Sequence, residues 1–178
     1  IGVNAITNYT SVLDKNKLTE FDMLLAHELG HALGLHHANG LECVDGVLSA
    51  DCENIEYGNN FDIMGGFGYY SFHYSAYYKY LLGWLTPDQV TEVNSNGQYE
   101  ITPQENGSKT RLVKINIANK PQYFIEMRAP FGFDSNLAID SLKSNQSGIF
   151  VNKILLGSGF VKSLLLDMSP GAAGQWYP

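Results

Sequence analysis

Apolar residues recur at helical spacing in the segment that begins near Thr19. Intervals of three and four residues are typical of one face of an α-helix, and Thr19 followed by Asp22 is close to a capping box. We expect a helix from about residue 19 and a second, short helix between Ser75, a suitable cap, and Gly83. The apolar positions of the first helix, expected to pack in a core, are Phe21, Leu24, Leu25, Leu29, Ala32 and Leu33.

Alternating apolar and polar residues replace the helical spacing in the second half of the chain. Loops rich in Pro, Gly, Asn and Ser separate the alternating segments, which is typical of strands joined by turns. In the second segment, alternation places Glu126 and Arg128 on one face, where we expect a structural pair rather than a second active site. The expected strands lie over residues 111–117, 122–128 and 148–154.

Residues 38–62 show no period and are expected to form a long loop without regular secondary structure, which in a compact domain is usually functional. Many of its side chains offer oxygen atoms, and calcium is one candidate ligand for them. A solvated acidic loop is the alternative, because no spacing here fits the regular calcium loop. The oxygen-bearing side chains are Asp45, Asp51, Glu53, Asn54, Glu56 and Asn60.

Two cysteines, Cys43 and Cys52, stand nine residues apart in the same stretch. We expect a disulfide bond that closes this short loop and therefore an oxidising compartment. Two free thiols are the alternative.

Composition narrows the class of protein. Of 178 residues, 44% are hydrophobic and 16% charged, which favours a globular chain over a disordered one. A net charge of −7 gives no electrostatic footprint for nucleic acid or an anionic membrane. No apolar run approaches the roughly 20 residues that span a bilayer. Because the chain starts at Ile1, we expect a processed product or a fragment.

The strongest chemical signal is a run of histidines with an acidic neighbour. On a helix, His27 and His31 project from the same face, one turn apart. Gly34 can end that helix with a positive φ, so that His37 reaches the same ion. Glu28 then lies beside the metal, where it can accept the proton of a metal-bound water. A buried helix with merely hydrogen-bonded histidines is the alternative, but it explains neither the glutamate nor the glycine.

These residues match H-E-x-x-H-x-x-G-x-x-H at every fixed position and so resemble the metzincin zinc proteases. The segment 62–65, Asp-Ile-Met-Gly, looks like the methionine turn of that group, with Met64 as its methionine. Residues 72–85 look like the helix and Leu-Gly-Trp signature of the gametolysin-like family, and more distantly of the immune inhibitor A type. Since the latter typically has Asp as third ligand, His37 favours the gametolysin-like family.

The resemblance implies an α+β fold in two parts. Residues 1–93 would hold the zinc-binding helix, the loop, the methionine turn and a closing helix, and residues 94–178 a β-rich segment. Metzincins normally carry an upper sheet subdomain before the zinc helix. Only 26 residues precede His27, so this subdomain is expected to be largely absent, and an N-terminal subdomain or a second chain is a candidate partner.

The resemblance also implies an activity. We expect a secreted zinc metalloendopeptidase that cleaves protein or peptide substrates, with Zn²⁺ on the three histidines and Glu28 as general base. Some metzincins place a tyrosine two residues after the turn methionine, where this chain has Gly66. Tyr69, Tyr70 and His73 are therefore candidate oxyanion or substrate contacts. The alternative function is a non-catalytic binding or adhesion module that retains a structural zinc.

Overall fold

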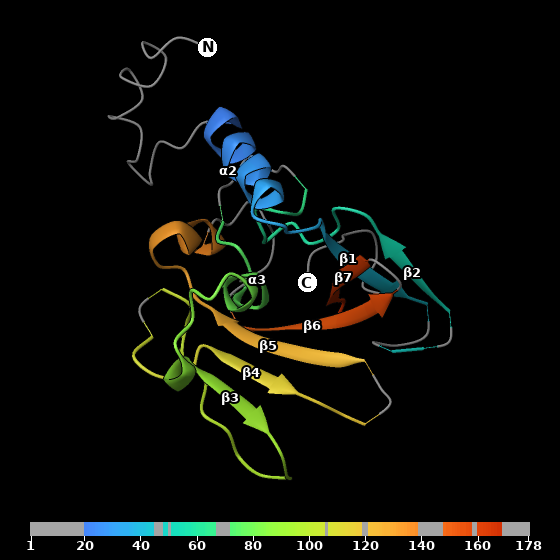
Figure 1. The fold of residues 1–178 in the computed structure, drawn as a ribbon, viewed down its shortest axis with the longest axis vertical. Coiled ribbons are helices and arrows are strands. Elements are labelled where there is room, and N and C mark those ends of the chain that lie inside the picture. The colour runs from blue at the N-terminus through green and yellow to red at the C-terminus, as the bar shows by residue number, and fades with distance from the viewer. Residues whose placement is uncertain are drawn as a thin grey trace.

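One mixed sheet of seven strands is the largest element of the described fold (Figure 1). The computed structural model describes residues 20–44, 48–49, 51–66, 72–105, 107–118, 121–138, 148–157 and 160–168. The predicted α+β class is confirmed. The elements in chain order are α2 (Glu20–Ala32), β1 (Ala38–Cys43), β2 (Cys52–Ile55), α3 (Ala76–Leu81), η1 (Pro87–Gln89), β3 (Val90–Val93), β4 (Leu112–Ile115), β5 (Gln122–Arg128), η2 (Gly132–Ala138), β6 (Gly148–Gly157) and β7 (Phe160–Leu166).

The strands follow the order β2-β1-β7-β6-β5-β4-β3. The pairs β1–β7 and β3–β4 are parallel and the other four pairs are antiparallel. Strand β1, which follows α2 closely in the chain, pairs with β7 near its end. The sheet therefore joins strands from both sides of residue 93.

The three strands expected from alternation are all present. Strand β5 has the predicted bounds, whereas β4 is shorter than predicted and β6 is longer. Val113 is buried in β4, but Ile117 lies beyond the end of that strand and is exposed. Alternation is informative here because these strands run through the middle of the sheet, where burial selects one side chain in two.

The prediction of an irregular loop over residues 38–62 is wrong, because β1 and β2 lie within it. The sequence of β1, Ala-Asn-Gly-Leu-Glu-Cys, contains four residues of types that are depleted in strands. Long-range pairing overrides this weak propensity, since β1 has β2 on one side and β7 on the other. Cys43 lies opposite Cys52 in the hairpin, and the predicted disulfide between them is confirmed.

Helix α2 does not bury the apolar side chains that its spacing predicts in a core. It projects beyond the sheet, on the side of α3 (Figure 1). Its packed face carries Met23, His27 and Gly30, whereas the apolar residues around the rest of the helix are exposed. Exposed by 44–59% are Phe21, Leu24, Leu25, Leu29 and Leu33.

Helix α3 lies on one face of the sheet and forms the main core with it. Ser75 caps the helix as predicted, with its hydroxyl oxygen accepting from the N–H of Tyr78 at 3.4 Å. Gly83 follows the helix with a φ of +70°, which also agrees with its predicted role. The core joins α3, the sheet and the segment around α2, and it contains Leu35, Ala38, Met64, Ala76, Tyr77, Tyr78, Leu112, Phe124 and Ile154.

A buried charge network on the same face confirms the predicted pair of Glu126 and Arg128, whose side chains lie 3.6 Å apart. Arg128 donates two hydrogen bonds to Asp134 and one to the carbonyl of Phe61. Burial opposes the charge of Arg128, but Asp134 and Glu126 outweigh it and raise its pKa. Glu126 also accepts from the N–H of Ala76 at 2.8 Å. The network thereby ties β5 to α3 and to residue 61.

Candidate metal centre

Helix α2 and the turn that ends it bring three histidines together. His27 and His31 lie one turn apart on α2, as their spacing predicts. Gly34 has a φ of +91°, and its N–H donates to the carbonyl of His31 at 2.9 Å, so the helix ends where predicted. The chain turns there and places His37 beside the two helical histidines.

The three imidazoles lie close enough to share one metal ion. One ring nitrogen from each lies within 4.8 Å of those from the other two. The ring centroids are 4.7 Å apart for His27 and His31, and 4.9 Å apart for His31 and His37. His27 is buried, and the other two rings are half-buried. Three converging imidazoles with an accessible side are the donor set that zinc takes in catalytic sites.

Backbone carbonyls fix the two helical rings. His27 contacts the carbonyl of Ile63 through Nδ1 at 2.8 Å. His31 contacts the carbonyl of Leu35, again through Nδ1, at 2.9 Å. A histidine that donates from Nδ1 carries its lone pair on Nε2, which is the usual arrangement around a bound metal. Both rings are therefore oriented before any ion arrives.

The turn over residues 61–66 supports α2 from below. Asp62 accepts from the N–H of Met64 and from that of Ser75, both at 2.8 Å. Burial raises the pKa of Asp62, and these two hydrogen bonds act against that shift. The Met64 side chain is fully buried, and its sulfur lies so close to Gly30 that any side chain there would collide with it. Met64 thus packs directly against α2 at Gly30, and its role as a turn methionine stays a prediction.

His37 lies outside α2, and other segments hold it. A carboxylate oxygen of Glu56 lies 2.9 Å from its Nδ1. The Tyr57 ring packs against the His37 ring, with centroids 3.9 Å apart. The Tyr78 hydroxyl lies 2.9 Å from the His37 carbonyl, and burial raises the pKa of Tyr78, so the phenol remains a donor at neutral pH.

Sequence reasoning missed Glu56 and Tyr57 as site residues. In the sequence, Glu56 stands out only as one of several oxygen donors for calcium, and Tyr57 belongs to none of the motifs. The signal that could have found them is the pair of cysteines: a disulfide between Cys43 and Cys52 closes a hairpin. Because His37 directly precedes β1, the residues that directly follow β2 must return to it.

The other predicted contacts have different surroundings. Glu28 is exposed on α2, adjacent in sequence to the buried His27. His73 pairs through Nε2 with Glu105, and its ring meets the edge of Phe133 at 5.3 Å. His73 therefore makes its ring contacts with the β-rich part of the chain. Two further candidate contacts, Tyr69 and Tyr70, lie outside the described residues.

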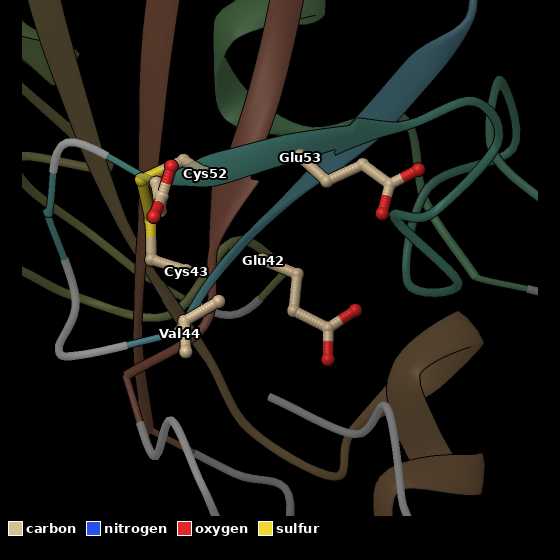
Figure 2. Close-up of a pocket in the computed structure, with 6 residues that line it drawn as sticks. Glu42, Cys43, Val44, Cys52 and Glu53 are labelled. Carbon is tan, nitrogen blue, oxygen red and sulfur yellow. A yellow bond between two sulfur atoms is a disulfide. The ribbon is translucent and has the colours of Figure 1, made fainter.

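The acidic loop considered for calcium forms a pocket beside the disulfide. Figure 2 shows Glu42 and Glu53 at this pocket, and they are direct partners across β1 and β2. Among the described residues, histidine, cysteine and carboxylate side chains could share one ion only where their ligand atoms lie close together. The group that meets this criterion is His27, His31 and His37, away from this pocket. Calcium binding stays a prediction.

Comparisons with models of protein families, with curated proteins and with solved structures return no match for this chain. The family resemblance therefore rests on the motifs quoted above, and the metal centre rests on the geometry of His27, His31 and His37.

Proposed function

We propose that this chain is a secreted zinc-dependent metalloendopeptidase of the metzincin type. The observation that carries the proposal is the convergence of His27, His31 and His37, with ring nitrogens within 4.8 Å of one another. Zinc is one of the metals that imidazole nitrogens bind, and catalytic zinc sites with three protein ligands leave a fourth position to water. The matched spacing of Glu28 and Gly34 supports the same assignment.

Zinc bound to three imidazoles lowers the pKa of a water ligand and polarises a peptide carbonyl. Glu28 follows His27 directly on α2 and is exposed, so it can meet both water and substrate. In the proposed reaction its carboxylate accepts the proton of the attacking water and then returns it to the leaving amine. The buried turn under α2 fixes the helix from which Glu28 projects.

The alternative function, a binding or adhesion module with a structural zinc, predicts a closed site. Structural zinc sites usually have four protein ligands. In the part of the chain that the structure describes, the metal group has three members. This count favours a catalytic site with an exchangeable position.

Secretion is supported by the Cys43–Cys52 disulfide, because such bonds persist in oxidising compartments. Among the described residues, no helix has the length and apolar character needed to cross a bilayer. We propose protein or peptide substrates. The second wall of the substrate cleft, from an N-terminal subdomain or a second chain, stays a prediction.

Metal analysis and peptide-library digestion of the parent chain and of Glu28→Gln test the proposal. We expect about one zinc per chain in both proteins, and hydrolysis by the parent that a chelator abolishes. Losing the general base should lower the hydrolysis rate by about 10²–10⁴-fold while zinc is retained. Equal casein cleavage by both proteins would refute the mechanism, and a fourth side chain on the metal in an anomalous-scattering map would favour the binding module.

A further inference from the structure

Tyr57 stands in a backbone conformation that bulky residues rarely adopt. Its φ is +59°, and in the described ranges it is the one residue other than glycine with a positive φ. Glycine, asparagine and aspartate enter this region at lower cost, whereas for a bulky side chain it is an outlier. Such outliers persist where the surrounding structure imposes them and often mark functional sites.

The neighbouring glycine does not relieve this conformation. Gly58 is required for packing, because a Cβ there would lie 2.7 Å from the backbone nitrogen of Gly40 in β1. Its φ is not positive. The sequence thus has a glycine where β1 approaches and a tyrosine at the adjacent position, where φ favours glycine. Because tyrosine is unfavourable at this φ, its presence indicates that the side chain has a function.

Hydrogen bonds on both sides hold the Tyr57 backbone in place. Its N–H donates to the Asn39 side chain at 3.1 Å, and its carbonyl accepts from the N–H of Gly66 at 2.7 Å. Asn39 is buried in β1, two residues after His37, and Gly66 ends the turn over residues 61–66. The two segments that carry parts of the metal centre therefore impose the conformation of Tyr57.

The ring of Tyr57 lies over the histidines rather than in the core. Its centroid is 3.9 Å from that of His37 at an interplanar angle of 35°, and 6.2 Å from that of His27 at 28°. The residue is 37% exposed, and the core clusters of the described chain do not contain it. Burial of apolar surface thus does not account for this placement.

We propose that Tyr57 is a positioning residue of the metal centre, whose aromatic ring holds His37 in the orientation that binds the ion. His37 differs from the helical histidines because its Nδ1 partner is the exposed carboxylate of Glu56. One hydrogen bond in the ring plane leaves the imidazole free to tilt about that bond. A second ring packed on its face removes this freedom. The inference rests on the proposed zinc site.

Zinc titration in competition with a chromophoric chelator tests the inference on the parent chain, Tyr57→Asn and Tyr57→Phe. Asparagine tolerates the positive φ but lacks the ring, whereas phenylalanine keeps the ring and loses the hydroxyl. We expect Tyr57→Asn to bind zinc about 10–100-fold more weakly, as for other residues that orient a metal ligand. Tyr57→Phe should stay within about threefold of the parent, because stacking needs no hydroxyl.

The melting temperature of each protein without metal separates positioning from folding. Tyr57→Asn should melt within about 2 °C of the parent or above it, because the unfavourable φ is relieved. Tyr99→Asn, which removes a tyrosine of similar exposure, 39%, on another loop, should leave zinc affinity unchanged.

Parental zinc affinity in Tyr57→Asn would overturn the inference and leave the proposed function standing. Weaker binding together with a large fall in melting temperature would also overturn it, by showing a structural role. A parent chain that binds no zinc would instead refute the proposed function and the inference with it.

Discussion

The two sides of the metal centre are built differently. His27 and His31 belong to one helix, and backbone carbonyls fix their rings. The turn beneath them is buried, and Asp62 binds it to α3 through the N–H of Ser75. We call residues 20–35 and 61–66 the helix side.

His37 belongs to the other side, the hairpin side, which we define as residues 36–58. Here the ring is held by the side chains of Glu56 and Tyr57, and the Glu56 side chain is 68% exposed. Backbone partners cannot be removed by substitution, whereas side-chain partners can. Stability and metal affinity should therefore separate. Loss of buried contacts beneath the helix side should lower the free energy of unfolding, whereas loss of the two side chains that hold the His37 ring should mainly weaken metal binding.

Arg128→Met should give the largest effect, because it breaks the network beneath the helix side. The substitution leaves Asp134 and Glu126 buried without their cation. Removing one partner of a buried ion pair costs about 3–5 kcal/mol. We expect a loss of that size in the free energy of unfolding, measured by urea denaturation. Arg111→Met is the control, since the half-buried guanidinium of Arg111 donates to the carbonyl of Gly107. A parental urea midpoint for Arg128→Met would contradict the role of the network.

Removing the disulfide should have the next largest effect. The double variant Cys43→Ser with Cys52→Ser opens a loop with a sequence separation of 9. Loop-closure entropy predicts a loss of about 2–3 kcal/mol in the free energy of unfolding. The measurement is the urea midpoint of the oxidised parent and the variant, with reduced parent as the control. Equal midpoints would show that β1 and β2 are held by their strand pairing alone.

The range over which a contact acts along the chain decides which parts of the molecule could be predicted from sequence. Local signals predicted α2, α3 and the central strands, because caps, glycines and alternation act within a few residues. The residues of the proposed metal centre belong to the same class: His27 and His31 lie one turn apart on α2, and Gly34 follows two residues after its end. His37 follows within one short turn.

What sequence could not predict depends on distant partners. β1 forms because β7, more than a hundred residues later, pairs with it. Tyr57 in turn reaches His37 because the β1–β2 hairpin returns the chain to the start of β1. The exposed apolar residues of α2, such as Leu25, are the opposite case: helical spacing predicts an apolar helix but does not supply the layer that would cover it.

Glu56→Ala tests how His37 is held on the hairpin side. The substitution removes the partner of His37 Nδ1, and losing such a partner typically costs 10–100-fold in metal affinity. We expect zinc affinity to fall by about tenfold, or about 1.4 kcal/mol, because the carboxylate is exposed and partly replaced by water. The urea midpoint without metal should stay parental.

Glu53→Ala, which removes an exposed carboxylate on β2, is the control and should bind zinc like the parent. Equal affinity in Glu56→Ala would remove Glu56 from the centre.

The smallest effect concerns the pH dependence of stability beneath the helix side. Burial, with Arg128 nearby, lowers the pKa of Lys79 from 10.5 to about 8. Between these values the unfolded chain holds a proton that the folded chain has lost, so stability rises with pH. Above pH 10 Tyr77, whose pKa burial raises to about 12, acts in the opposite direction.

The difference between the parent and Lys79→Met isolates the lysine from Tyr77, which both proteins share. From pH 8 to 10 we expect the parent to gain on the order of 1 kcal/mol in the free energy of unfolding relative to Lys79→Met. Urea denaturation at four pH values measures this gain. Parallel profiles for the two proteins would mean that Lys79 titrates alike in both states. In that case the ammonium group, with Gln104 at 3.2 Å, would be well solvated by its polar neighbours.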